Sequence, residues 1–174
     1  MKAKIISFII GGLIGFALWS VQTKAWASPA GYKEMSQVEV ADPEEFMEEN
    51  AVDIPKEVSD ICEKYGEEYN ICPEVCEAIC WRESRCTANA KNGLCRGIMQ
   101  VNEKVHKDRM KKLKVTDIYD LDGNIHVGFD LLSDLYSTNK NMKEALDAYN
   151  GNSNSEYSKQ VLKVAKCLDM TGGD

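Results

Sequence analysis

Apolar side chains recur three or four positions apart through much of residues 55–170, and no stretch of any length alternates between apolar and polar residues. Spacing of this kind places the apolar side chains on one face of a helix, whereas alternation would favour strands. The chain is 44% hydrophobic and 28% charged, so it can bury a core within a single domain. The pattern therefore predicts a mainly α-helical body of five to seven helices joined by short loops.

Residues that favour helix starts occur at intervals along this predicted helical body. Proline suits the first turn because it lacks the N–H that is unpaired there, and Asp, Asn and Ser side chains accept hydrogen bonds from the first N–H groups. The predicted helices begin at Pro55, Pro73, about Asn102, Asp122, Asn141, and Ser153 or Ser155, and end near residues 69, 83, 113, 136, 149 and 168. The polar stretch Thr87–Gly97, which contains Asn92-Gly93, is expected to be a loop.

Residues 1–27 have the features of an export signal. Lys2 and Lys4 precede an apolar run, and Ala25-Trp26-Ala27 offers the small residues that a signal peptidase reads, with cleavage before Ser28. The alternative is an uncleaved anchor over residues 5–21, although that run is short for the roughly 20 residues that span a bilayer. Either way we expect an exported chain, secreted or associated with the cell envelope, that meets a membrane only through this segment.

Acidic residues gather in the first half of the chain. Residues 34–77 hold 15 acidic and two basic side chains, whereas residues 78–174 hold 13 acidic and 15 basic ones. With a formal net charge of −7, the chain is not expected to bind nucleic acid. Residues 28–55 contain Ser-Pro, Asp-Pro and Ile-Pro pairs, which predicts a solvated acidic linker before a functional domain over residues 56–170.

Seven cysteines are many for 174 residues, and three of them, Cys72, Cys76 and Cys80, recur every fourth residue. At that spacing all three lie on one face of the predicted helix, where neighbours rarely have the geometry that a disulfide needs. Each of these thiols would therefore need a partner elsewhere in the chain. The remaining cysteines are Cys62, Cys86, Cys95 and Cys167.

Disulfides are the expected use of these cysteines, because exported chains lie in an oxidising compartment. Cys86 and Cys95 bracket the loop around Asn92-Gly93 and would pin that loop to itself, and Cys62 and Cys167 would then serve two of the three helical thiols, with one cysteine left over. The alternative is a zinc site, but zinc sites usually use shorter loop spacings than this helical pattern. We expect a disulfide-stabilised domain with no metal and no cofactor, and its disulfide connectivity stays open.

Glu83 stands at the end of an apolar stripe formed with Val75 and Ile79, directly before Ser84 and the polar loop. A carboxyl group that leaves the core side of a helix is partly desolvated, which raises its pKa. A raised pKa lets the group hold a proton near neutral pH and donate it to a leaving oxygen. Glu83 is therefore the candidate general acid.

Four short patterns follow one another from Glu83 onward. They are Glu83-Ser84, Gly97-Ile98-Met99-Gln100, a looser Asn124-Ile125 with Gly128 and Leu131-Leu132, and Ala148-Tyr149-Asn150. In this set the chain resembles the soluble lytic transglycosylase (SLT) domain family, which cleaves the glycan strands of bacterial peptidoglycan and is related in fold to goose-type lysozyme. The resemblance covers about residues 58–168. It implies a lysozyme-like helical catalytic domain within residues 56–170.

The resemblance also implies a mechanism that uses one acid. Glu83 would protonate the glycosidic oxygen between N-acetylmuramic acid and N-acetylglucosamine, and its carboxylate would then take a proton from the muramic C6 hydroxyl. The product would carry 1,6-anhydro-N-acetylmuramic acid, formed without water. No other Asp or Glu lies between Glu83 and Gln100, and Asn102 stands where goose-type lysozymes carry an aspartate.

The same resemblance implies a substrate-binding set. Ser84 would hydrogen-bond near the acid or the substrate's acetamido group, and Gly97 would let the backbone approach the sugar. Met99 would line the cleft, and Tyr149 would place its hydroxyl near Glu83. The full set comprises Ser84, Gly97, Met99, Gln100, Asn102, Tyr149 and Asn150.

Two other functions stay open. A muramidase, which is a true hydrolase, would need a second carboxylate from elsewhere, such as Asp120, Asp122 or Asp147. A non-catalytic peptidoglycan-binding or assembly module would need no desolvated acid. For an enzyme, the short chain suggests local wall opening for a secretion or conjugation apparatus, and general turnover, phage infection and spore processes fit equally well.

Overall fold

The computed structural model describes residues 28–152, 154 and 156–172. Their helices are α1 (Tyr32–Ser36), α2 (Pro43–Glu49), α3 (Lys56–Tyr69), α4 (Pro73–Ser84), α5 (Lys107–Lys112), α6 (Leu121–Asn139), α7 (Met142–Tyr149) and α8 (Tyr157–Thr171). The short strands are β1 (Lys91–Asn92), β2 (Cys95–Arg96) and β3 (Val101–Asn102). The prediction of a mainly helical body is confirmed, and α3 to α8 fall within the expected five to seven helices.

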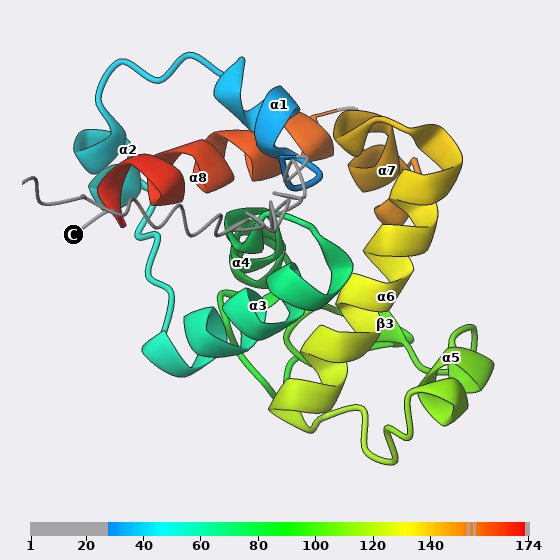
Figure 1. The fold of residues 1–174 in the computed structure, drawn as a ribbon. Coiled ribbons are helices and arrows are strands. Elements are labelled where there is room, and N and C mark those ends of the chain that lie inside the picture. The colour runs from blue at the N-terminus through cyan, green and yellow to red at the C-terminus, as the bar shows by residue number, and fades with distance from the viewer. Residues whose placement is uncertain (1–27, 153, 155, 173–174) are drawn as a thin grey trace, which may run out of the picture.

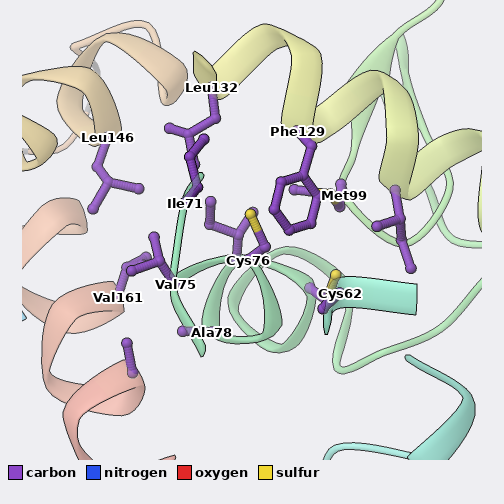
Figure 2. Close-up of a cluster of buried hydrophobic side chains, with 14 of the residues drawn as sticks. Cys62, Ile71, Val75, Cys76, Ala78, Met99, Phe129, Leu132, Leu146 and Val161 are labelled. Carbon is purple, nitrogen blue, oxygen red and sulfur yellow. The ribbon is translucent and has the colours of Figure 1, made fainter. Parts of the chain in front are cut away.

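The core forms around α4, which is buried continuously from Val75 to Trp81. Helices α3 and α8 pack against α4, and α6 packs against both α3 and α7 (Figure 1). Figure 2 shows Val75 and Cys76 of α4 facing side chains of three other helices, among them Phe129 of α6, Leu146 of α7 and Val161 of α8. Because α4 is buried on all sides over these residues, it forms the centre of the core. The C-terminal end of α4 places the candidate acid at the edge of the core.

The segment predicted to be a solvated linker is instead folded, and that prediction is wrong. Ala30 forms a parallel bridge with Ile71, in which the Ala30 N–H donates to the Asn70 carbonyl over 2.8 Å. In α1, Met35 is only 1% exposed, and Phe46 of α2 packs on the core. Helices α1 and α2 both lie against α8 (Figure 1). Apolar side chains set between the acidic ones hold the segment down, because burying each one is favourable by roughly 1.5–3 kcal/mol.

Several predicted helix starts are confirmed and three are shifted. Pro55, Pro73 and Asn141 stand at the starts of α3, α4 and α7, and Asn141 Oδ1 accepts from the Glu144 N–H over 3.1 Å. Helix α6 begins two residues earlier than predicted, because its N-cap is Asp120 rather than Asp122, and Asp120 accepts the capping bond from the Gly123 N–H over 2.8 Å.

The other two shifts concern α5 and α8. Helix α5 begins at Lys107, because Asn102 belongs to β3 and its Oδ1 accepts from the N–H groups of Lys104 and Val105. Glu156 occupies the N-cap position of α8 without a side-chain capping bond, while Ser153 and Ser155, the predicted caps, lie outside the described residues. Asn102 thus makes a local turn where the sequence suggested a helix start.

The region predicted as a loop contains a small antiparallel sheet in the order β1-β2-β3. Cys95 pairs with Asn102 and Arg96 with Val101. Strands of two residues are too short to produce an alternating sequence pattern, so periodicity could not reveal them. Strands β1 and β2 lie between the end of α4 and the Gly97–Gln100 loop, and β3 follows that loop.

The seven cysteines are all free thiols in the structure, so the predicted disulfides are not present. Cys62, Cys72, Cys76, Cys80 and Cys167 are buried, and they fill the core as small apolar side chains. Cys86 and Cys95 do not close the loop between them, because both are free, partly exposed thiols.

Two further features bear on the predictions. No group of three or more His, Cys, Asp or Glu side chains within the described residues is arranged to hold a metal ion. In the same part of the chain, no helix combines the length and apolar character that crossing a membrane requires. The predicted signal or anchor over residues 1–27 lies outside the described residues.

Candidate active site

Glu83 lies in the last turn of α4, where the helix ends at Arg85 in a left-handed conformation. Its Oε1 accepts a hydrogen bond from the hydroxyl of Tyr157 over 2.7 Å. Tyr157 is the first residue of α8 and is 2% exposed, so its ring is fixed by the contact between α8 and α4. The packing of two helices therefore positions the carboxyl group.

Burial raises the pKa of Glu83, and this effect outweighs the hydrogen bond from Tyr157 and the positive charge of Arg82, which both lower it. Burial also raises the pKa of Tyr157 well above its usual value, helped by the nearby Glu83 charge. Tyr157 therefore stays a hydrogen-bond donor, and Glu83 holds its proton to a higher pH than an exposed glutamate does. This is the protonation state that a general acid needs.

No second carboxylate acts on the pKa of Glu83 among the described residues; the charge that does so is Arg82. The three aspartates named above as candidates for the second carboxylate of a hydrolase form bonds elsewhere. Asp120 caps α6, Asp122 accepts from Lys64 and from the Tyr65 hydroxyl over 2.7 Å each, and Asp147 pairs with Lys143 over 3.0 Å. Each of these aspartates is therefore held by other partners, and Glu83 has its hydrogen bond from Tyr157.

The loop that follows the sheet is held close to α6 by Asn124. The Asn124 side chain accepts from the Met99 N–H over 2.9 Å and donates to the carbonyls of Arg96 and Ile118 over 3.1 and 2.8 Å. Gly97 has a φ of 76°, and a Cβ there would lie 2.1 Å from Asn124 Nδ2. Glycine is required at this position both by the backbone conformation and by the close approach of Asn124.

Ser84 joins the end of α4 to this loop. Its hydroxyl donates to the Ile98 carbonyl over 2.7 Å, also lies 3.1 Å from the Cys80 carbonyl, and accepts from the Thr87 N–H over 3.1 Å. These contacts are to backbone groups, whereas the sequence suggested a contact near the acid or the sugar. Ser84 therefore positions the loop relative to Glu83.

Two members of the predicted set lie deeper than expected. Met99 is fully buried, with its sulfur packed against Gly128 of α6 and its side chain near Phe129 (Figure 2), so it belongs to the core and does not line a cleft. The Tyr149 hydroxyl donates to the Met99 carbonyl over 2.8 Å. Burial raises the pKa of Tyr149 well above its usual value, and the Glu83 charge adds to this, so Tyr149 lies near the acid without bonding to it.

Gln100 offers an unused acceptor. Its backbone has a φ of 50°, and its Nε2 donates to the Gly97 carbonyl over 2.7 Å. Its buried Oε1 has no hydrogen-bond partner among the described residues. Buried polar atoms are normally paired, so this unpaired acceptor is an exception, and because the atom is buried a ligand reaches it only when the side chain turns outward.

The two asparagines of the predicted set have structural positions. Asn102 makes the local turn described above, and Asn150 is the C-cap of α7, with its N–H donating to the Leu146 carbonyl over 3.1 Å. The structure thus gathers Glu83, Ser84, Gly97, Gln100 and Tyr149 around one loop, and it assigns Met99 to the core.

Sequence reasoning missed Tyr157 and Asn124 as site residues. Tyr157 received no role from the sequence, and the available signal was a hydroxyl-bearing side chain among the periodic apolar residues of α8. Asn124 was noted only as part of a loose pattern, and the available signal was an amide among the apolar residues of α6. Buried polar side chains of this kind usually carry hydrogen bonds that fix a structure.

A sequence model of the transglycosylase SLT domain matches residues 60–165, which is more than half of the chain. The chain belongs to the SLT domain family. The match spans Glu83, the Gly97–Gln100 loop, Tyr149 and Tyr157, and it leaves out α1 and α2. No curated protein matches the chain significantly. SLT domains are in general peptidoglycan lytic transglycosylases, so peptidoglycan is the substrate class that membership indicates.

Proposed function

We propose that this chain is a peptidoglycan lytic transglycosylase in which Glu83 acts first as the acid and then as the base. The observation that carries the proposal is the environment of Glu83: a half-buried carboxyl group with a raised pKa, one hydrogen bond from Tyr157, and no second carboxylate acting on it within the described residues. Ordinary glycosidases use two carboxylates, whereas a transglycosylase can work with one.

The steps balance without water. Glu83 donates its proton to the oxygen that links C1 of N-acetylmuramic acid to N-acetylglucosamine, and the bond from C1 to that oxygen breaks. N-acetylglucosamine leaves with a hydroxyl group. The Glu83 carboxylate then accepts the proton of the muramic C6 hydroxyl while O6 bonds to C1, which closes the 1,6-anhydro ring and returns Glu83 to its protonated form.

The residues around Glu83 divide into two groups in this proposal. Gln100 contacts the sugar once its side chain turns outward, so that the buried and unpaired Oε1 accepts from a substrate N–H or hydroxyl. Asn102 and Asn150 contribute further amide contacts to the glycan. The loop that carries Gln100 is held in position relative to Glu83 by Ser84, Gly97, Met99 and Tyr149. Tyr157 orients the Glu83 carboxyl group.

The proposal extends to where the enzyme works. An export signal or anchor over residues 1–27 would deliver the domain to the cell envelope, where its substrate lies. Such a location and substrate fit local opening of the wall for a secretion or conjugation apparatus. That role and its partners belong to the proposal alone.

The mass of the products tests the proposal. Residues 28–174 are incubated with purified peptidoglycan, beside a Glu83→Gln variant and a Glu77→Gln control, which changes another poorly exposed glutamate of the same helix. The proposal predicts anhydro-muropeptides from the native chain and from the control, and none from Glu83→Gln. Products heavier by one water would indicate a muramidase, and binding without any release would indicate a non-catalytic module.

A further inference from the structure

A cavity of about 480 Å³ lies between α2, the end of α4 and α8, and Arg82, the residue directly before Glu83, is part of its wall. Its walls include Phe46, Asn50, Trp81, Arg82, Arg85 and Lys163. Phe46 and Asn50 come from the part of the chain that the SLT family match leaves out. The Trp81 indole N–H donates to the Ala51 carbonyl over 3.2 Å, which fixes the end of α2 against α4.

Three positively charged side chains line this cavity without an ion-paired carboxylate among the described residues. Arg82, Arg85 and Lys163 form no ion pair with any carboxylate in the described part of the chain. The exposed glutamates of α2 do not line the cavity. An uncompensated group of cations, two of them guanidinium groups, favours a carboxylate or phosphate that can accept several hydrogen bonds at once.

The cations lie over aromatic rings, which holds them in place. The Arg85 guanidinium is 3.6 Å from the centroid of the Trp81 ring, and Lys163 Nζ is 4.2 Å from that of Phe46. Cations held over rings keep their hydrogen-bonding groups free, because a ring face takes up none of them in a directed bond. The cations of the cavity are therefore positioned to bind an anion in the absence of a ligand.

The walls favour a peptide over a bare phosphate. Trp81 and Phe46 supply apolar surface, and the amides of Asn50 and Gln160 can pair with peptide groups. Gln160 Oε1 accepts from Arg82 Nε over 2.9 Å and so orients that side chain. A ligand that combines an aliphatic part, amide groups and a carboxylate matches the aromatic, amide and cationic side chains of the walls.

Arg82 connects the cavity to the acid. It directly precedes Glu83 on α4, and its guanidinium lies 5.9 Å from the ring of Tyr157, whose hydroxyl bonds to Glu83. We propose that the cavity binds a carboxylate-bearing peptide stem of the glycan strand that is being cut. This inference rests on the proposed function for its substrate and adds a specificity site to which α2 contributes.

Kinetics on two substrates test the inference. Arg85→Gln and Lys163→Gln are compared with Lys159→Gln, which changes an exposed lysine of α8 that does not line the cavity. The substrates are peptide-bearing strands and strands stripped of peptides by an amidase. We expect KM for the peptide-bearing strands to rise about tenfold in the two cavity variants, since one charged hydrogen bond is worth about that factor, and to stay unchanged for stripped strands. Equal kinetics for all variants, or equal losses on both substrates, would overturn the inference.

A binding measurement separates this inference from the proposed function. Glu83→Gln is titrated calorimetrically with the stem peptide released by an amidase, with the same peptide amidated at its carboxyl groups, and with inorganic phosphate. The inference predicts that the stem peptide with free carboxyl groups binds and that the amidated peptide does not. It also predicts that inorganic phosphate binds more weakly than the stem peptide. Phosphate binding as tight as that of the peptide would overturn it in favour of an anionic wall polymer. Cleavage of stripped strands by the native chain reports on the proposed function alone.

Discussion

The Tyr157 hydroxyl lies 2.7 Å from Oε1 of Glu83 and links the first residue of α8 to the last turn of α4. Burial raises the pKa of Glu83, while this hydrogen bond stabilises the carboxylate and opposes the rise. A residue that acts as acid and then as base needs both forms to be accessible. Tyr157 is therefore a positioning residue that also lowers the pKa of Glu83.

Replacing Tyr157 with phenylalanine is expected to shift the pH dependence of activity. The change removes a donor that stabilises the carboxylate, so the pKa of Glu83 rises further. Since the protonated acid starts the reaction, the limb on which the rate falls with rising pH moves to higher pH. Initial rates of peptidoglycan solubilisation between about pH 4 and 9 measure this shift. Tyr69→Phe, which removes a hydroxyl bonded to Asp130, is the matched control and should leave the limb in place.

Gly97→Ala should destabilise the domain far more than Gly93→Ala. Both glycines have positive φ, so alanine strains the backbone at either position by roughly 1–2 kcal/mol. At Gly97 the new Cβ also meets Asn124 Nδ2 at 2.1 Å, whereas at Gly93 nothing lies within 4 Å. Urea unfolding of the two variants gives the comparison. Equal losses would show that Asn124 does not approach Gly97 as described.

Asn124→Ala should lower the free energy of unfolding by roughly 2–4 kcal/mol, because it leaves buried backbone groups of Arg96, Met99 and Ile118 without their partner. Asn139→Ala removes a single side-chain bond to the Leu135 carbonyl on the same helix and should cost less. Chemical unfolding measures both. A loss of under about 1 kcal/mol for Asn124→Ala would contradict the clamp that we assign to this residue.

Glu77→Gln is expected to stabilise the domain at neutral pH. Glu77 is 7% exposed, and burial raises its pKa, with a smaller opposing effect from a hydrogen bond to Ser59. Because the pKa is higher in the folded chain, the stability that protonation contributes is present in acid and is lost as pH rises through the folded value. The melting temperature of Glu77→Gln should therefore exceed that of the native chain at pH 7, with the difference vanishing below about pH 4. A lower melting temperature at pH 7 would contradict this account.

Alkylation of the native chain should reach two thiols first. Cys86 and Cys95 are partly exposed, whereas the other five cysteines are buried. Burial raises the pKa of Cys86 to about 12, so its reaction is slow at neutral pH even though a reagent can reach it. Mass mapping after brief treatment with iodoacetamide locates the modified residues. Early modification of Cys76 or Cys80 would contradict the packing of α4.

The helices and the acid could be predicted from the sequence, because helical spacing and short motifs are local features. The positions of Pro73 and Asn141 at helix starts were correct for this reason. The fold of residues 28–55 could not be predicted, since the acidic composition hid the few apolar residues, such as Met35 and Phe46, that dock on α8. Acidic composition describes the exposed face of such a segment and not its buried one.

The candidate site illustrates the same limit. The resemblance predicted that Tyr149 would place its hydroxyl near Glu83. The Glu83 charge does raise the pKa of Tyr149, but the Tyr149 hydroxyl bonds to the Met99 carbonyl, and Tyr157 makes the hydrogen bond to Glu83. Which of two tyrosines reaches the acid depends on how α7 and α8 pack on α4, and no local pattern encodes that. The cysteine spacing correctly indicated one helix face, but it did not reveal that the face is filled by core side chains.

Digestion of peptidoglycan in water enriched in ¹⁸O tests the central claim most directly. In the proposed reaction the muramic O6 bonds to C1, so no oxygen from the solvent enters the new product end. We predict muropeptides that end in 1,6-anhydro-N-acetylmuramic acid with no ¹⁸O incorporated by the native chain, and no products from Glu83→Gln. Reducing ends that carry one ¹⁸O atom would show that water attacks C1 and would contradict the account.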